Sequence, residues 1–174
     1  TTEDVMGKTL ATDANVEPGC GGQGGPDVVY RIDLAQRSLL HVAVVVPFPT
    51  RLYLRAGSCI SGSQVYCADE AFTTNPIEAG TYFLFVDSNA PIAKGDFTLA
   101  VSTTPAVLPS NDTCDAAETL DFGDNGVASV TTSSIYALDQ YDGFCATEGN
   151  GPDVVYRFTT DQTYSVTVDF QAAF

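Results

Sequence analysis

Acidic residues give this sequence its clearest capacity to bind a metal ion. Calcium takes six to eight oxygen ligands, and carboxylates in loops held by a nearby disulfide suit it. The candidate ligands for Ca²⁺ are Asp69, Glu70, Asp87, Asp27 and Asp153. For the first three the alternative is a solvated acidic loop. For Asp27 and Asp153 it is a structural role, in which each carboxylate caps the preceding turn by accepting backbone N–H groups.

Cysteines form the second group of reactive side chains, and there are five of them. Cys59 and Cys67 flank an expected hairpin turn at residues 61–63, so strand pairing would place them opposite each other. We also expect a disulfide between Cys114 and Cys145. Cysteines at paired spacings favour an oxidising compartment. Buried free thiols in a cytosolic protein are the alternative, and a zinc site is disfavoured because the spacing is wrong and only one histidine is present.

Catalysis is not expected from this sequence. The single histidine, His41, lies between Leu40 and Val42 in an expected strand, so a structural position on the strand face is favoured over a catalytic base. No serine stands in a G-x-S-x-G context, and the H-E-x-x-H and nucleotide-binding motifs are absent. The glycine-rich run at residues 21–25 precedes a strand rather than a helix, which is not the context of a phosphate-binding loop.

The overall charge limits the partners of the protein. The formal net charge is −15, from 22 acidic and 7 basic residues. A negative field of this size repels phosphate backbones and anionic lipid surfaces, which excludes nucleic acid and disfavours membrane binding. No continuous apolar stretch approaches the roughly 18 residues of a membrane-spanning helix.

Alternating apolar and polar residues predict a series of short strands. The period of two indicates strands that bury one face, and Gly, Pro, Asn and Ser residues separate them. The expected strands cover residues 5–10, 27–34, 39–47, 51–57, 64–68, 81–87 and 96–103, and residues 115–120 are expected to form one helical turn. This pattern predicts an all-β fold, an antiparallel, jelly-roll-like β-sandwich.

One eight-residue stretch occurs twice. GPDVVYRI at residues 25–32 returns as GPDVVYRF at residues 151–158, and the similarity continues without a gap to Phe174 at the same offset of 126. A period of about 126 residues is the size of a domain rather than of a solenoid unit. We therefore expect a tandem repeat. The expected parts are a first unit at residues 1–103 without its opening segment, a linker at 104–110, and a second unit at 111–174 without its later part.

The repeat also accounts for the fifth cysteine. Cys20 corresponds to Cys145, and the counterpart of Cys114 would precede residue 1. On this interpretation Cys20 is unpaired through truncation. An alternative is strand donation, in which residues near 109–126 of one copy complete the open first unit of another and a filament forms. Truncation is preferred, because donation leaves residues 127–174 without a clear purpose.

The segment AGTYFLFVDSNAPIAKGDFTLAVS at residues 79–102 resembles the end of the bacterial pre-peptidase C-terminal domain. The fuller pattern, with NDTC, GPDVVYRF and RLYLRAGSC, is similar to repeats that occur in tandem in secreted and surface proteins of bacteria. This resemblance covers nearly all of the chain. It implies a jelly-roll-like sandwich, a secreted or cell-surface location, a non-catalytic role and, in some members, bound calcium.

These observations together predict a non-catalytic structural or adhesive module of a secreted or surface protein, with fibre formation and calcium stabilisation as further properties. Its expected partners are neighbouring repeats or other copies of itself, a polysaccharide or an extracellular protein. The alternative function is an accessory substrate-binding or folding domain of a secreted peptidase. The aromatic residues Tyr53, Phe83 and Phe85 either form a platform for sugar or peptide or pack under a loop.

Overall fold

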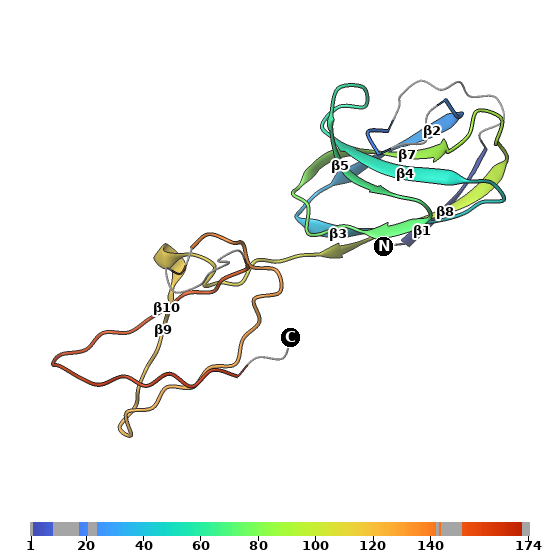
Figure 1. The fold of residues 1–174 in the computed structure, drawn as a ribbon. Coiled ribbons are helices and arrows are strands. Elements are labelled where there is room, and N and C mark those ends of the chain that lie inside the picture. The colour runs from blue at the N-terminus through green and yellow to red at the C-terminus, as the bar shows by residue number, and fades with distance from the viewer. Residues whose placement is uncertain (1, 9–17, 21–23, 142, 144–150, 172–174) are drawn as a thin grey trace. The chain divides into compact units, whose positions relative to one another are not determined.

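The computed structural model describes residues 2–8, 18–20, 24–141, 143 and 151–171. The chain divides into two compact units, Thr1–Val107 and Leu108–Phe174, which are drawn in Figure 1. The division falls inside the segment expected to be the linker. Within the described ranges, no helix has the length and apolar character needed to cross a bilayer.

The described residues of the first unit form eight strands. They are β1 (Thr2–Lys8), β2 (Asp27–Leu34), β3 (Ser38–Val45), β4 (Thr50–Ala56), β5 (Ser63–Ala68), β6 (Ala71–Thr73), β7 (Gly80–Ser88) and β8 (Asp96–Pro105). Seven of them overlap the strands that the alternation of residues predicts. The exception is β6, which is too short, at three residues, for a period of two to be recognised.

The strands form two antiparallel sheets, with the orders β1-β8-β3-β6 and β2-β7-β4-β5. We call these sheet I and sheet II. The chain folds back on itself about the β4–β5 connection, so that β1 pairs with β8, β2 with β7, β3 with β6, and β4 with β5. Figure 1 shows the two sheets as two layers. Eight strands folded back in this way are the arrangement of a jelly-roll sandwich, which confirms the predicted fold class.

The core lies between the two sheets, and the alternation along each strand explains its composition. In β3 the residues Leu40, Val42 and Val44 are buried, while His41 is only half-buried and Ala43 is exposed. The core contains Leu34, Leu40, Val42, Val44, Leu52, Leu54, Phe72, Tyr82, Leu84, Val86, Phe97 and Leu99. Burial of each large apolar side chain contributes roughly 1.5–3 kcal/mol to folding.

The disulfide of this unit joins Cys20 to Cys67, with the two Cα atoms 6.6 Å apart. The predicted Cys59–Cys67 bond is therefore wrong, and so is the prediction that Cys20 is unpaired. The reason is the register of β4 and β5. Cys67 lies opposite Tyr53 on β4, whereas Cys59 lies in the loop between the two strands and keeps a free thiol.

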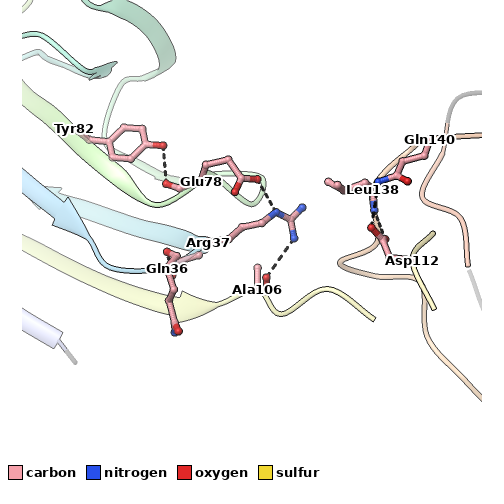
Figure 2. A network of polar contacts seen from close by, with 9 residues as sticks. Gln36, Arg37, Glu78, Tyr82, Ala106, Asp112, Leu138 and Gln140 are labelled. Carbon is pink, nitrogen blue, oxygen red and sulfur yellow. Dashed lines mark hydrogen bonds and ion pairs between the residues drawn. The ribbon is translucent and has the colours of Figure 1, made fainter. Parts of the chain in front are cut away.

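The end of the first unit is held by Arg37, in the turn between β2 and β3. Arg37 Nε forms an ion pair with Glu78 at 3.2 Å, and its Nη1 donates to the carbonyl of Ala106 at 3.3 Å. Figure 2 shows Arg37 between these partners. The backbone N–H of Ala106 donates to the carbonyl of Arg37 at 3.0 Å. Strand β8 thus continues to Pro105 and Ala106 is buried, so the start of the predicted linker belongs to the first unit.

The second unit has little regular structure in its described residues. It contains a 3-10 turn at Cys114–Ala116 and two short strands, β9 (Glu118–Thr119) and β10 (Tyr156–Arg157). The 3-10 turn lies at the start of the predicted helical turn, but the chain then enters β9. The two strands pair in parallel. Cys145 lies outside the described residues, so its predicted bond to Cys114 stays a prediction.

The two copies of the repeated sequence differ in structure. Residues Asp27–Leu34 form a complete strand, but the second copy has strand geometry only at Tyr156–Arg157. The counterparts of the buried Leu40, Val42 and Val44 are Val166, Val168 and Phe170, which are 47%, 81% and 81% exposed. In the first unit β2 pairs with β7 and β3 pairs with β8, and positions 126 residues after β7 and β8 lie beyond Phe174. Among the described residues, the second copy pairs with β9 instead, at Tyr156 and Arg157.

Candidate functional site

The outer face of sheet II, which points away from the core, brings two of the predicted metal ligands together. Asp27 is the cross-strand neighbour of Asp87, and Asp87 is in turn the neighbour of Arg51 on β4. Both carboxylates are buried, with 6% and 2% of their surfaces exposed. Neighbouring residues on one face of a sheet have Cβ atoms about 5 Å apart, so the side chains of Asp27, Asp87 and Arg51 lie side by side in one row across the sheet.

Of the other predicted ligands of this unit, Asp69 binds the same arginine and Glu70 is exposed. Asp69, after β5, forms an ion pair with Arg51 Nη1, so its carboxylate already has a cation as partner. Glu70 is exposed, and its backbone carbonyl accepts from Val44 N at 2.9 Å. In the part of the chain that the structure describes, there is no group of three or more His, Cys, Asp or Glu side chains close enough together to hold a metal ion. The structure thus brings Asp27 and Asp87 together, and calcium binding by the predicted ligands stays a prediction.

Asp153 belongs to the second unit, where it binds backbone groups. Its Oδ2 accepts from Gln140 N at 2.8 Å and from Tyr141 N at 3.2 Å, and its own N–H donates to Leu138 O at 3.1 Å. A carboxylate that accepts backbone N–H groups is the alternative considered above for Asp153. The Asp153 carboxylate caps residues 138–141, whereas the sequence predicted that it would cap the Gly-Pro turn at residues 151–152.

A second carboxylate, Asp112, holds the same segment. Asp112 is buried, and its Oδ1 accepts from Leu138 N at 2.8 Å while its Oδ2 accepts from the Gln140 side chain at 3.4 Å. Figure 2 shows the Asp112 carboxylate with these two partners. Reasoning from the sequence did not single out Asp112. The available signal was its place in the Asn-Asp-Thr-Cys motif that opens the second unit.

Two of the three aromatic residues considered for a binding platform, Tyr53 and Phe85, are buried, while Phe83 is partly exposed. Tyr53 and Phe85 are cross-strand neighbours on the outer face, 0% and 1% exposed, and their rings stack at 4.4 Å. The guanidinium of Arg55 lies over both rings at 5.6 Å, a cation–π arrangement. Cys67 on β5 is the cross-strand neighbour of Tyr53. Its disulfide to Cys20 brings residues 18–20 to this face of the sheet. The alternative in which the aromatics pack under a covering segment therefore holds for Tyr53 and Phe85.

Arg31 and Asp33 are an exposed polar pair on the outer face of β2. Arg31 Nη2 and Nε donate to Asp33 Oδ1 at 3.0 and 3.2 Å, and the Thr81 hydroxyl donates to the same oxygen at 2.7 Å. The hydrogen bond from Thr81, followed by the bond and charge of Arg31, holds the pKa of Asp33 below its usual value. Since both side chains are largely exposed, the pair adds little to stability.

His41 lies on the outer face of sheet I between two hydroxyl groups. Its Nδ1 is 3.0 Å from Thr73 Oγ1 on β6, and its Nε2 is 2.9 Å from Thr104 Oγ1 on β8. A shallow depression of about 390 Å³ adjoins it. With both ring nitrogens held by hydroxyls of neighbouring strands, His41 occupies the strand-face position that the sequence favours.

A groove of about 550 Å³ runs beside β2 at one edge of the sandwich. It is lined by residues 30–36 of β2 and the following turn, with Ser38, and by Leu99, residues 101–103 and Pro105 of β8. Tyr30 forms its aromatic wall and meets Phe97 edge to face at 6.5 Å. Burial raises the pKa of the Tyr30 phenol. The groove thus combines an apolar wall with the polar pair of Arg31 and Asp33.

Comparisons with known proteins give likenesses of structure only. No model of a protein family matches the sequence, and no curated protein matches it. Among solved structures, a periplasmic inhibitor of g-type lysozyme from Aeromonas hydrophila is 12% identical with a TM-score of 0.45, and covers 59% of this chain and 86% of its own. The Yersinia pseudotuberculosis-derived mitogen is 11% identical with a TM-score of 0.43, covering 59% and 85%. The pre-peptidase C-terminal domain of a collagenase from Bacillus anthracis is 14% identical with a TM-score of 0.43, covering 58% of this chain and 89% of its own.

Proposed function

We propose that this chain is a non-catalytic structural or adhesive module of a secreted protein. The observation that carries the proposal is the Cys20–Cys67 disulfide, which fastens residues 18–20 onto the outer face of sheet II. Disulfides persist in oxidising compartments such as the periplasm and the extracellular space. A jelly-roll sandwich closed by such a bond gives a rigid body suited to spacing or attachment.

The surroundings of the reactive side chains are in keeping with this role. His41 is held by Thr73 and Thr104, and Asp69 is paired with Arg51. General acid–base catalysis needs a titratable group within reach of substrate in a cleft. These side chains instead join neighbouring strands and turns, which serves the stability of the sandwich.

Binding assays with multivalent beads test the adhesive role. Beads that carry many copies of the chain should bind cellulose, chitin or immobilised collagen at least about a hundredfold more tightly than the free chain, because linked weak contacts gain effective concentration. Beads carrying the reduced and alkylated chain are the control and should bind less. Equal binding by both preparations, no binding to any surface, or turnover in peptidase and glycosidase assays would contradict the proposal. Binding to denatured collagen alone would favour an accessory domain of a peptidase.

Calcium binding stays a prediction, and the Asp27–Asp87 pair is the place to test it. Two buried carboxylates side by side repel each other, and cations offset that repulsion. Arg51 beside Asp87 is one such cation, and Ca²⁺ would be a second. If calcium binds there, the melting temperature should fall on addition of EDTA and recover with excess calcium, and Asp27→Asn should abolish the difference. A melting temperature that is the same with calcium and with EDTA would remove calcium from the description.

A further inference from the structure

Among the residues that the structure describes, no strand pairs with the outer edge of β2 in the first unit. Sheet II ends at β2 in the part of the chain that the structure describes. Ser88 N donates to Pro26 O at 3.2 Å, which fixes the phase of the β2–β7 ladder. Hydrogen-bonding groups alternate along an antiparallel strand. The backbone groups of residues 28, 30 and 32 therefore face β7, and those of Val29 and Arg31 face away from it.

The second unit contains the same strand sequence with a segment bound along it. Residues 151–157 are identical to residues 25–31, so Val155 and Arg157 are the counterparts of Val29 and Arg31. Val155 N donates to Asn111 O at 2.8 Å and Val155 O accepts from Glu118 N at 3.1 Å, while Arg157 O accepts from Leu120 N at 2.8 Å. The bound segment is residues 111–120, which we call the edge segment.

Side chains support the same contact. Asn111 Nδ2 donates to Val155 O at 3.2 Å, and Arg157 Nε donates to Thr119 Oγ1 at 2.9 Å. The same groups are present in β2, because the two strands are identical at these positions. Arg31 Nε, which donates to Asp33 in the first unit, would exchange that bond for one to Thr119. The groove beside β2 adds room along this edge for apolar side chains such as Ala117 and Leu120.

We propose that the β2 edge binds the edge segment of a second copy of this chain, by parallel strand addition at Val29 and Arg31. The edge segment would leave the receiving strand of its own second unit and bind the identical strand β2 of another copy. The hydrogen bonds broken within one copy are therefore re-formed between two copies. A donor in one unit and an acceptor in the other make a head-to-tail contact, which builds an open chain of copies rather than a closed dimer. The inference deepens the proposed structural role by naming its partner.

Matched proline variants of the whole chain test this proposal. Proline removes a backbone N–H and is tolerated on an edge strand where that N–H points outward. Val155→Pro weakens the internal receiving strand and frees the edge segment, so it should increase the oligomer fraction seen by sedimentation velocity. Val29→Pro removes the donor on the β2 edge and should abolish the oligomers. The double variant should be monomeric.

A labelled peptide spanning residues 110–121, with Cys114→Ser to prevent disulfide exchange, measures the same contact directly. Val29→Pro should weaken its binding to the chain by at least about tenfold relative to the unsubstituted protein, since a bound partner carbonyl would lose its donor. A peptide with Asn111→Ala should also bind less tightly, and a scrambled peptide should not bind.

Several results would overturn the proposal. They are Val155→Pro remaining monomeric at every concentration, oligomers surviving Val29→Pro, and equal peptide binding with and without that substitution. Circular dichroism checks that Val29→Pro folds, and Arg31→Pro, with an N–H on the same side, replaces it if it does not. The bead assay is separate, so failure here and failure of the adhesive role are distinguishable.

Discussion

Identical residues in the two copies of the repeated stretch meet different surroundings, and the glycines show this most clearly. A Cβ atom added at Gly25 would overlap the backbone carbonyl of Ser88 at the end of β7, and Gly25 is buried. At the matching Gly151, nothing lies within 4 Å of the added atom. Glycine therefore permits a close approach of two backbones at position 25 and has no such role at position 151.

Gly25→Ala should destabilise the first unit by about 1–3 kcal/mol, because a strand carbonyl cannot move aside without breaking its ladder. Gly151→Ala is the matched control and should change the free energy of unfolding by less than about 0.5 kcal/mol. Urea unfolding followed by circular dichroism measures both. Equal effects of the two substitutions would contradict the backbone contact described for Gly25.

At the scale of elements, the disulfide decides how residues 18–20 meet sheet II. Cys67 lies on β5 beside Tyr53, and its bond to Cys20 spans 47 residues of sequence. Gly19 N also donates to the Gln64 side chain on β5 at 2.8 Å. Residues 18–20 and the edge strand β5 are thus joined by one covalent bond and one hydrogen bond.

Cys20→Ser should lower the free energy of unfolding of the first unit by about 2–4 kcal/mol, since the bond closes a long loop of the unfolded chain. Cys59→Ser should leave it nearly unchanged. Thermal unfolding of the two variants gives the comparison, and mass spectrometry of the unreduced digest should find the peptides of Cys20 and Cys67 linked. A linked pair of Cys59 and Cys67 would instead restore the pairing expected from sequence.

At the scale of the molecule, the chain has two copies of the β2 and β3 sequences but one copy of the β7 and β8 sequences. In the first unit each of these strands has its neighbour, and the core is complete. In the second unit the edge segment supplies one side of the receiving strand, and residues 164–170 keep their apolar side chains exposed. The proposed association uses the edge of β2, because the second unit shows the edge segment bound along the counterpart of that strand.

Much of the fold could be predicted from the sequence, for a physical reason. The side chains of a strand alternate between two faces, so Leu40, Val42 and Val44 reveal a buried face before any partner strand is known. Turn residues between such runs gave the number and positions of seven of the eight strands in the first unit. The β-sandwich followed, because sheets with one apolar face must pack against another such face.

Local sequence determined the strands of the first unit and their buried faces, whereas the repeated GPDVVYR forms a full strand in only one of its two copies. Tertiary structure alone decided that Cys67 bonds Cys20 rather than Cys59, that Asp27 meets Asp87, and that Tyr53 and Phe85 are covered. Each of these depends on the register and order of strands far apart in the chain. A shift of one residue in pairing moves every side chain to the other face, and no local pattern records which distant strand is the neighbour.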